Sequence, residues 1–148
     1  MHAFRREEPR IEIEALCWEL VDGQETSGLA LDLSPTGLRL ERPYAGGRTR
    51  RDVAIQIEVP GIDEVMWARA DACFDILVPS KAPQAGPLGL IRRTGYRIAL
   101  AARRDLRMLE EFVRETYRRR VAAERSSFEH ELVLGPAGLP GLQARASA

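Results

Sequence analysis

Apolar and polar residues alternate along much of the first hundred positions of the chain. The clearest run has valine or isoleucine at positions 53, 55, 57 and 59, with small or polar residues between them. A period of two predicts strands that bury one face in a core. The pattern predicts six short strands, at residues 11–20, 28–34, 38–41, 53–59, 65–76 and 95–101.

Short turn signals separate most of these strands. Val21-Asp22-Gly23-Gln24 follows the first strand, Pro35-Thr36-Gly37 the second and Pro60-Gly61 the fourth. Six short strands joined by short turns are typical of an antiparallel barrel or sandwich. Residues 78–93 contain three prolines and are too long for a hairpin turn, so we expect either a functional or a disordered loop there.

The second predicted strand has leucine at every other position. Leu29, Leu31 and Leu33 are expected to point into the core, which directs Asp32 and Ser34 to the other face. These two polar side chains are therefore expected on the outer face of the barrel, near its rim.

After residue 101 the spacing of apolar residues changes from two to three or four. One helical face is apolar from there on, at positions 106, 109, 112, 113 and 117, and the helix is expected to continue towards Glu124. The final residues, GPAGLPGLQARASA, are rich in Gly, Pro and Ala. We therefore divide the chain into an N-terminal arm at residues 1–10, a barrel with its helix at 11–125 and a disordered tail at 126–148.

The composition fits one small globular domain without strong charge. The formal net charge is zero, so no overall field draws the chain to nucleic acid or to an anionic membrane. All but one of the 22 basic residues are arginine, so short arginine motifs arise here by chance more often than usual. Cys17 and Cys73 suggest neither a disulfide framework nor a metal site. The first residues lack an apolar signal segment, and no stretch is long enough to span a membrane, so we expect a cytoplasmic protein.

Two polar clusters flank the first predicted hairpin, one just before its first strand and one at the end of its second strand. Arg5 and Arg6 begin the run RREEPR, which ends at Arg10 just before the first strand. The run DLSPTG, from Asp32 to Gly37, closes the second strand. Written as patterns, the clusters are RxxxR followed by DxSxxG. In this order and spacing they resemble the motifs of PilZ domains, small bacterial β-barrels that bind cyclic di-GMP (c-di-GMP).

The resemblance covers roughly residues 4–120 and includes the strand Gly95–Leu100 and the helix around Leu109–Val113. It implies a mainly β fold, a six-stranded antiparallel PilZ-type β-barrel with a C-terminal α-helix. It also implies a receptor that binds c-di-GMP through Arg6, Arg10, Asp32, Ser34 and Gly37. In this family an arginine directly before RxxxR goes with a stacked, intercalated pair of ligand molecules, so Arg5 implies two c-di-GMP molecules per site.

The chemistry of these residue types suits the implied ligand. Guanine presents the acceptors O6 and N7, which match an arginine fork, and N–H donors on its opposite edge, which suit a carboxylate such as Asp32. Arginine also forms paired bonds with phosphate. Arg6 and Arg10 on a mobile arm would close the ligand against Asp32 and Ser34, while Gly37 allows close approach to the backbone. Ordering the arm would change the surface offered to an unidentified downstream protein.

Other classes of function have less support. No nucleophile, base and oxyanion donors come together, so neither an enzyme nor a cofactor or metal site is expected, and His2 and His130 stand alone. One alternative is a PilZ-like protein-interaction module that binds no nucleotide. A barrel that binds single-stranded RNA or DNA is disfavoured by the zero net charge and by the lack of an aromatic row on any strand. Arg92 and Arg93 are expected either to reach the ligand phosphates or to face solvent.

Overall fold

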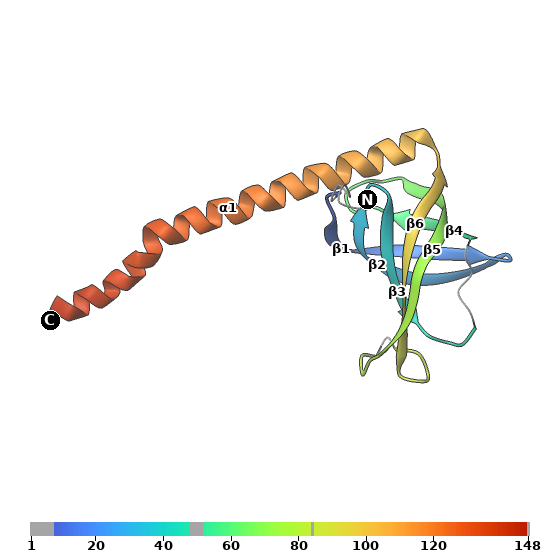
Figure 1. The fold of residues 1–148 in the computed structure, drawn as a ribbon, viewed down its shortest axis with the longest axis horizontal. Helices are drawn as coiled ribbons and strands as arrows, with labels where there is room; N and C mark the ends of the chain where they lie inside the picture. Colours follow the sequence, from blue (N-terminus) through green and yellow to red (C-terminus); the bar gives the residue numbers. More distant parts are fainter. Residues whose placement is uncertain (1–7, 48–51, 84, 148) are drawn as a thin grey trace, which may run out of the picture. The chain divides into compact units, whose positions relative to one another are not determined.

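Six antiparallel strands form a closed barrel, and one helix follows it (Figure 1). This computed structural model describes residues 8–47, 52–83 and 85–147, with side chains as far as Leu132. Around the barrel the strands follow the order β1-β2-β3-β6-β5-β4, and β4 pairs with β1. The elements are β1 (Ile11–Val21), β2 (Gln24–Ser34), β3 (Gly37–Pro43), β4 (Asp52–Glu58), β5 (Val65–Pro79), β6 (Leu90–Ala101) and α1 (Arg103–Ser147). The predicted fold class is confirmed.

The strands extend beyond the runs of alternation because their polar ends also pair. β2 begins at Gln24 instead of Gly28, and its first four residues pair with the end of β1. Asp22 and Gly23 turn the chain between the two strands with φ values of 51° and 78°. Positive φ at both central positions is what a two-residue hairpin turn requires, and Asp-Gly accommodates it.

The predicted loop at residues 78–93 is shorter than expected, because both of its ends belong to paired strands. β5 continues to Pro79, β6 begins at Leu90, and these two residues pair, which leaves residues 80–89 as the connection. The sequence pattern hides this pairing because both faces of the ribbon are accessible to solvent. Ile76 and Leu77, for example, are both exposed although they are adjacent. The prediction of a long loop is therefore corrected.

All six strands and the first turns of α1 contribute to the apolar interior. The fully buried side chains include Leu33, Leu40 and Ile55 of the barrel and Leu109 and Val113 of the helix. The chain separates into two compact units, residues 1–113 and 114–148. The helix thus belongs to the barrel unit as far as Val113.

The backbone of α1 is helical as far as Ser147, where the sequence analysis expected disorder from residue 126. Residues 121–134 are rich in Ala, Glu, Arg and Leu, which have high helix propensity. A helix that is already formed by packing also needs no new nucleus in order to grow. The division of the chain into an arm, a barrel with its helix and a disordered tail stays a prediction.

Two facing β-bulges, one in β1 and one in β2, interrupt the inward–outward alternation of side chains along these strands. One lies in β2 directly after Ala30, and the other lies in β1 directly after Glu12. Leu33 is fully buried as predicted, but Leu29 is 36% exposed and Leu31 is half-buried. The prediction that Leu29 and Leu31 point into the core is wrong, because one extra residue in a strand reverses the faces of the residues before it.

A chain of polar side chains, buried except for Asp75, links four strands of the barrel. Arg42 Nε lies 2.6 Å from Glu19 Oε1, and the Tyr96 hydroxyl donates a hydrogen bond to Glu19. Arg42 Nη1 donates to Thr94 Oγ1 at 3.0 Å, and Thr94 Oγ1 donates to Asp75 Oδ1 at 3.0 Å. Burial raises the pKa of Glu19, against the opposing effect of the Arg42 guanidinium. This network ties β1, β3, β5 and β6 together.

Candidate functional site

The two sequence motifs meet at the open end of the β1–β2 hairpin. Arg10 directly precedes β1, and Arg10 Nη1 donates a hydrogen bond of 2.9 Å to Asp32 Oδ1. The side chain of Arg10 is 56% exposed, whereas that of Asp32 is 7% exposed. Asp32 lies on the face opposite the buried Leu33, as predicted, but arginine covers its carboxylate.

Asp32 has a second arginine partner, which the sequence analysis did not identify. Arg39 of β3 stands opposite Asp32 in the ladder, with its Nε 3.3 Å from Asp32 Oδ2. Arg39 Nε is buried and has no hydrogen-bond partner of good geometry within the described residues. The register signal was available, since Ser34 and Gly37 flank a two-residue turn and the pairing counts back from them to Asp32 and Arg39. We call Arg10, Asp32 and Arg39 the arginine clasp.

Ser34 shapes the turn between β2 and β3. Its Oγ accepts hydrogen bonds from the backbone N–H groups of Gly37 at 3.0 Å and of Thr36 at 3.3 Å, and it donates to the Gly37 carbonyl at 3.3 Å. Ser34 is only 2% exposed, so the prediction that it lies open on the outer face is wrong. Such hydroxyl-to-backbone bonds hold a loop in one conformation. A contact between this hydroxyl and a ligand stays a prediction.

Gly37 allows a close approach by the barrel itself. A Cβ atom at this position would collide with the carbonyl oxygen of Tyr96 on the neighbouring strand β6. The absence of a side chain therefore lets the turn pack against β6. Approach of a ligand to the Gly37 backbone stays a prediction.

Gly37→Ala is expected to lower the free energy of unfolding by about 1–3 kcal/mol, because the new methyl group must displace the backbone of β6. Urea denaturation followed by circular dichroism measures the change. Thr36→Ala is the matched control, since Thr36 is exposed in the same turn and its loss is expected to cost less than about 0.5 kcal/mol. Equal stability of the Gly37→Ala variant and the wild type would contradict the packing argument.

The described part of the N-terminal arm lies against the same turn. Thr36 Oγ1 donates a hydrogen bond of 2.6 Å to Glu8 Oε2, in addition to the bond between Arg10 and Asp32. The segment that enters β1 therefore contacts both sides of the DxSxxG run. Arg5 and Arg6 lie outside the described residues, and their roles stay predictions.

The facing bulges open a hollow on the outer surface next to the arginine clasp. Its volume is about 560 Å³, and its lining residues are Glu12, Ile13, Glu14, Leu31 and Arg39. Ile13, Glu14 and Leu31 are the residues that the bulges leave out of the regular register. Bulges redirect side chains and are frequent next to functional sites. Here they place carboxylates, a guanidinium group and apolar surface around one space.

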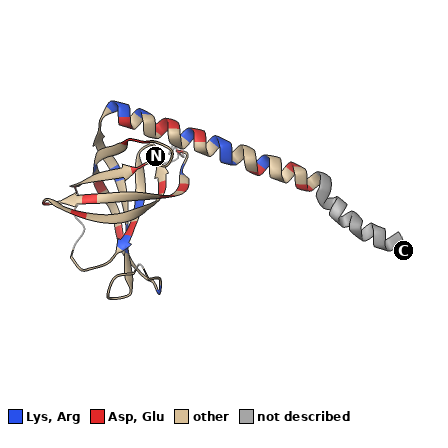
Figure 2. Cartoon of the chain, turned by 180° about the vertical axis from the view of Figure 1, so that it is seen from behind, with Lys and Arg blue, Asp and Glu red and all other residues tan. Residues whose placement is uncertain are grey.

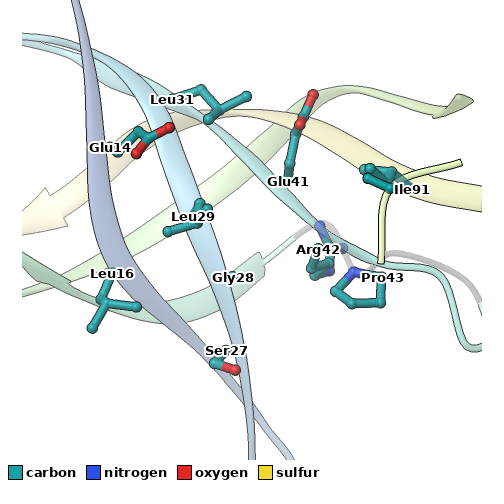
Figure 3. Close-up of a pocket in the computed structure, with 11 residues that line it drawn as sticks. Glu14, Leu16, Ser27, Gly28, Leu29, Leu31, Glu41, Arg42, Pro43 and Ile91 are labelled. Carbon is teal, nitrogen blue, oxygen red and sulfur yellow. The ribbon is translucent and has the colours of Figure 1, made fainter. Parts of the chain in front are cut away.

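A second, more apolar hollow adjoins the first (Figure 3). It has a volume of about 450 Å³ and shares Glu14 and Leu31 with the first hollow. Figure 3 shows Leu16 and Leu29 on the adjacent strands β1 and β2, with Glu41 of β3 nearby. Leu29 and Leu31, which were expected in the core, therefore form apolar surface together with Leu16, of the kind that contacts flat rings or protein partners.

Arg92 and Arg93 have partners away from the clasp. Arg93 forms an ion pair with Glu41. Arg92 Nε lies 3.4 Å from Asp75 Oδ1, and its guanidinium carbon lies 5.0 Å from the centre of the Tyr44 ring. These contacts give both arginines structural partners, and a contact of either one with ligand phosphates stays untested.

No known family profile matches the sequence, and no curated protein is significantly similar to it. Solved structures do share its fold. The Bacillus subtilis inhibitor of motility MotI/DgrA superposes with a TM-score of 0.59 at 14% identity, over 80% of this chain and 52% of that one. The PilZ domain of YcgR from Escherichia coli, solved with c-di-GMP, superposes with a TM-score of 0.57 at 19% identity. The match covers 83% of this chain and 98% of that domain. PlzA from Borreliella burgdorferi, in complex with c-di-GMP, superposes with a TM-score of 0.57 at 9% identity. The match covers 82% of this chain and 55% of PlzA.

The chain spans about half the length of MotI/DgrA and PlzA, and nearly all of the YcgR domain. The shared part is thus the barrel fold. In the described residues no helix is both long and apolar enough to cross a membrane.

Proposed function

We propose that this chain, a β-barrel with the PilZ-domain fold, is a receptor for c-di-GMP that passes the signal to a protein partner. Two structures with the same fold contain this ligand. The chain also carries RxxxR and DxSxxG at the two ends of its first hairpin. In this proposal the protein is a binding protein and not an enzyme, and it uses neither a cofactor nor a metal.

The observation that carries the proposal is the arginine clasp beside the bulge hollow. Arg10 and Arg39 approach the Asp32 carboxylate from two sides, at 2.9 and 3.3 Å. The clasp thus holds two guanidinium groups and one carboxylate, while Glu12 and Glu14 line the hollow beside it. Guanidinium groups form charge-assisted hydrogen bonds with phosphate, and the exposed Arg10 side chain would turn from Asp32 towards a phosphate of the ligand.

The remaining groups suit a guanine base. A guanine that enters the hollow would present its N–H edge to a carboxylate, either Asp32 of the clasp or Glu14, which lines the hollow. The apolar side chain of Leu31 offers a surface for the purine face. Arg39 would then contact a phosphate or the O6/N7 edge through its paired N–H groups.

We propose that two c-di-GMP molecules bind together, with Arg5 and Arg6 closing over them. Two stacked ligands bring four phosphate charges close together, and each further guanidinium group offsets part of that repulsion. The arm is already held beside the turn by Glu8 and Arg10. Rearrangement of the arm on binding would change the surface seen by a partner, and we place this signalling in the cytoplasm.

Titration calorimetry of the full chain with c-di-GMP tests the proposal. A receptor with a Kd of about 1 µM gives a complete binding curve at about 50 µM ligand, and the expected midpoint lies at two ligands per chain. Cyclic di-AMP is the matched control ligand, because it keeps both phosphates but lacks the guanine N–H edge. It is expected to bind at least about 100-fold more weakly.

The absence of heat at these ligand concentrations, with folded protein, would remove the proposal. The PilZ-like interaction module without nucleotide binding would then take its place. The apolar hollow beside the clasp, with exposed Leu16 and Leu29, is the surface that such a module would use.

A further inference from the structure

The separate helical unit of α1 carries an apolar stripe that the fold leaves exposed. Tyr117, Val121, Phe128 and Leu132 are between 37% and 61% exposed. At about 100° per residue, all four fall within about 60° of one another around the helix. A helix that projects four large apolar side chains from one face into water is stabilised when that face is covered.

Charge is distributed unevenly along the same segment. Basic residues dominate its first part, where Arg118 and Arg120 lie on either side of the stripe, and acidic residues follow in the second part, with Glu129 and Glu131 in the corresponding places. In Figure 2 the blue positions of this stretch are followed by red ones towards the grey end. A parallel pair of such helices would set like charges side by side, whereas an antiparallel pair sets opposite charges side by side.

We propose that α1 beyond Arg114 pairs in antiparallel orientation with the same helix of a second copy, which makes the protein a homodimer. When the two-fold axis passes between positions 124 and 125, Tyr117 is level with Leu132 of the second copy, and Val121 is level with its Phe128. Each apolar residue of the stripe therefore meets an apolar residue. The two positions at the axis hold opposite charges, Glu124 and Arg125.

The same register matches the charges that border the stripe. In an antiparallel pair, the same flank of each helix meets across the interface. Arg118 and Glu129 share one flank, and Arg120 and Glu131 share the other. Measured along the helix axis, Arg118 then lies within about one turn of Glu129 of the second copy, and Arg120 within about one turn of its Glu131. A single pairing geometry thus covers the stripe and brings opposite charges together on both flanks.

Sedimentation velocity of the full chain at several concentrations tests the dimer. The wild type is expected to sediment as a dimer at micromolar concentration. Val121→Glu combined with Phe128→Glu is expected to weaken the dimer by at least about 100-fold, because four carboxylates enter the apolar seam. Ala123→Glu combined with Ser126→Glu is the matched control on the opposite helix face, and it is expected to leave the dimer intact.

Charge reversal tests the orientation. Arg118→Glu with Arg120→Glu, or Glu129→Arg with Glu131→Arg, is expected to weaken the dimer, and all four changes together are expected to restore it. Disulfide cross-linking between two cysteine variants, each in a Cys73→Ser background, tests the orientation independently. Chains with Tyr117→Cys are expected to form disulfides with chains carrying Leu132→Cys, in preference to disulfides between identical chains.

A monomeric wild type at about 100 µM would overturn the proposal, since a helix pair of this size would be assembled at that concentration. A dimer that survives Val121→Glu with Phe128→Glu would also overturn it, because the interface would then lie elsewhere. Preferential disulfides between identical Tyr117→Cys chains would replace the antiparallel arrangement with a parallel one. None of these results depends on c-di-GMP.

Discussion

Arg10→Ala is expected to weaken c-di-GMP binding by at least about tenfold, because hydrogen bonds to charged groups contribute about 1.5–3 kcal/mol each. Arg10 belongs to the arginine clasp, is more than half exposed and already bonds the Asp32 carboxylate. Calorimetric titration measures the loss. Arg69→Ala is a matched control, since Arg69 forms an exposed ion pair of 2.7 Å with Asp52 on β4 and β5 and belongs to neither hollow.

Asp32→Asn separates two roles of the carboxylate. If Asp32 accepts the guanine N–H groups, the amide variant loses affinity by a similar factor, because only one of its terminal atoms is an acceptor. If Asp32 merely neutralises the two arginines, its removal strengthens binding to the phosphates. Tighter binding by Asp32→Asn would therefore contradict the base contact that we propose. Asp52→Asn is the corresponding control.

Glu19→Ala is expected to lower the free energy of unfolding by about 3 kcal/mol, since removing one partner of a buried ion pair is strongly destabilising. Glu19 is 5% exposed, bonds Arg42 and accepts from Tyr96 inside the barrel. Urea denaturation followed by tryptophan fluorescence measures the change. Glu25→Ala, at the exposed start of β2, serves as the control and is expected to cost less than about 0.5 kcal/mol.

The contribution of Glu19 to the free energy of unfolding changes with pH in a definite direction. Burial raises the pKa of Glu19 above its ordinary value of 4.5. The contribution of this group to stability is therefore fully present below that value and is lost as the pH rises through the folded-state pKa. Glu19→Gln mimics the protonated carboxyl at every pH, so its unfolding free energy is expected to rise relative to the wild type between about pH 4 and pH 7. A change in the opposite direction would mean that the Arg42 ion pair outweighs burial.

The hairpin that builds the site could be read from the sequence because its contacts are local. Arg10 precedes one strand and Asp32 closes the next, and a two-residue turn brings their ends together. The same reasoning, continued across the turn after Ser34, would have identified Arg39. The hollow itself was not predictable, because it depends on two bulges that alternation does not reveal.

The long-range polar network shows the limit of pattern reading. Glu19 and Tyr96 are 77 residues apart, and Arg42 and Thr94 are 52 residues apart. A glutamate in a strand of alternating residues can lie on the inner or the outer face of the barrel. On the inner face, only a partner from a distant strand offsets the free-energy cost of burying its charge. Register between distant strands decides whether that partner is present.

By itself the sequence determined the number and kind of elements, the tight turns and the meeting of the two motifs, because backbone alternation and turn chemistry act between near neighbours. Tertiary structure alone decided that Leu29 and Leu31 face outward and that Glu19 meets Arg42 and Tyr96. It also decided that Val78 and Pro79 pair with Ile91 and Leu90 and shorten the predicted loop. These outcomes depend on bulges and on cross-strand register, which are selected by the packing of the whole barrel and not by any one segment.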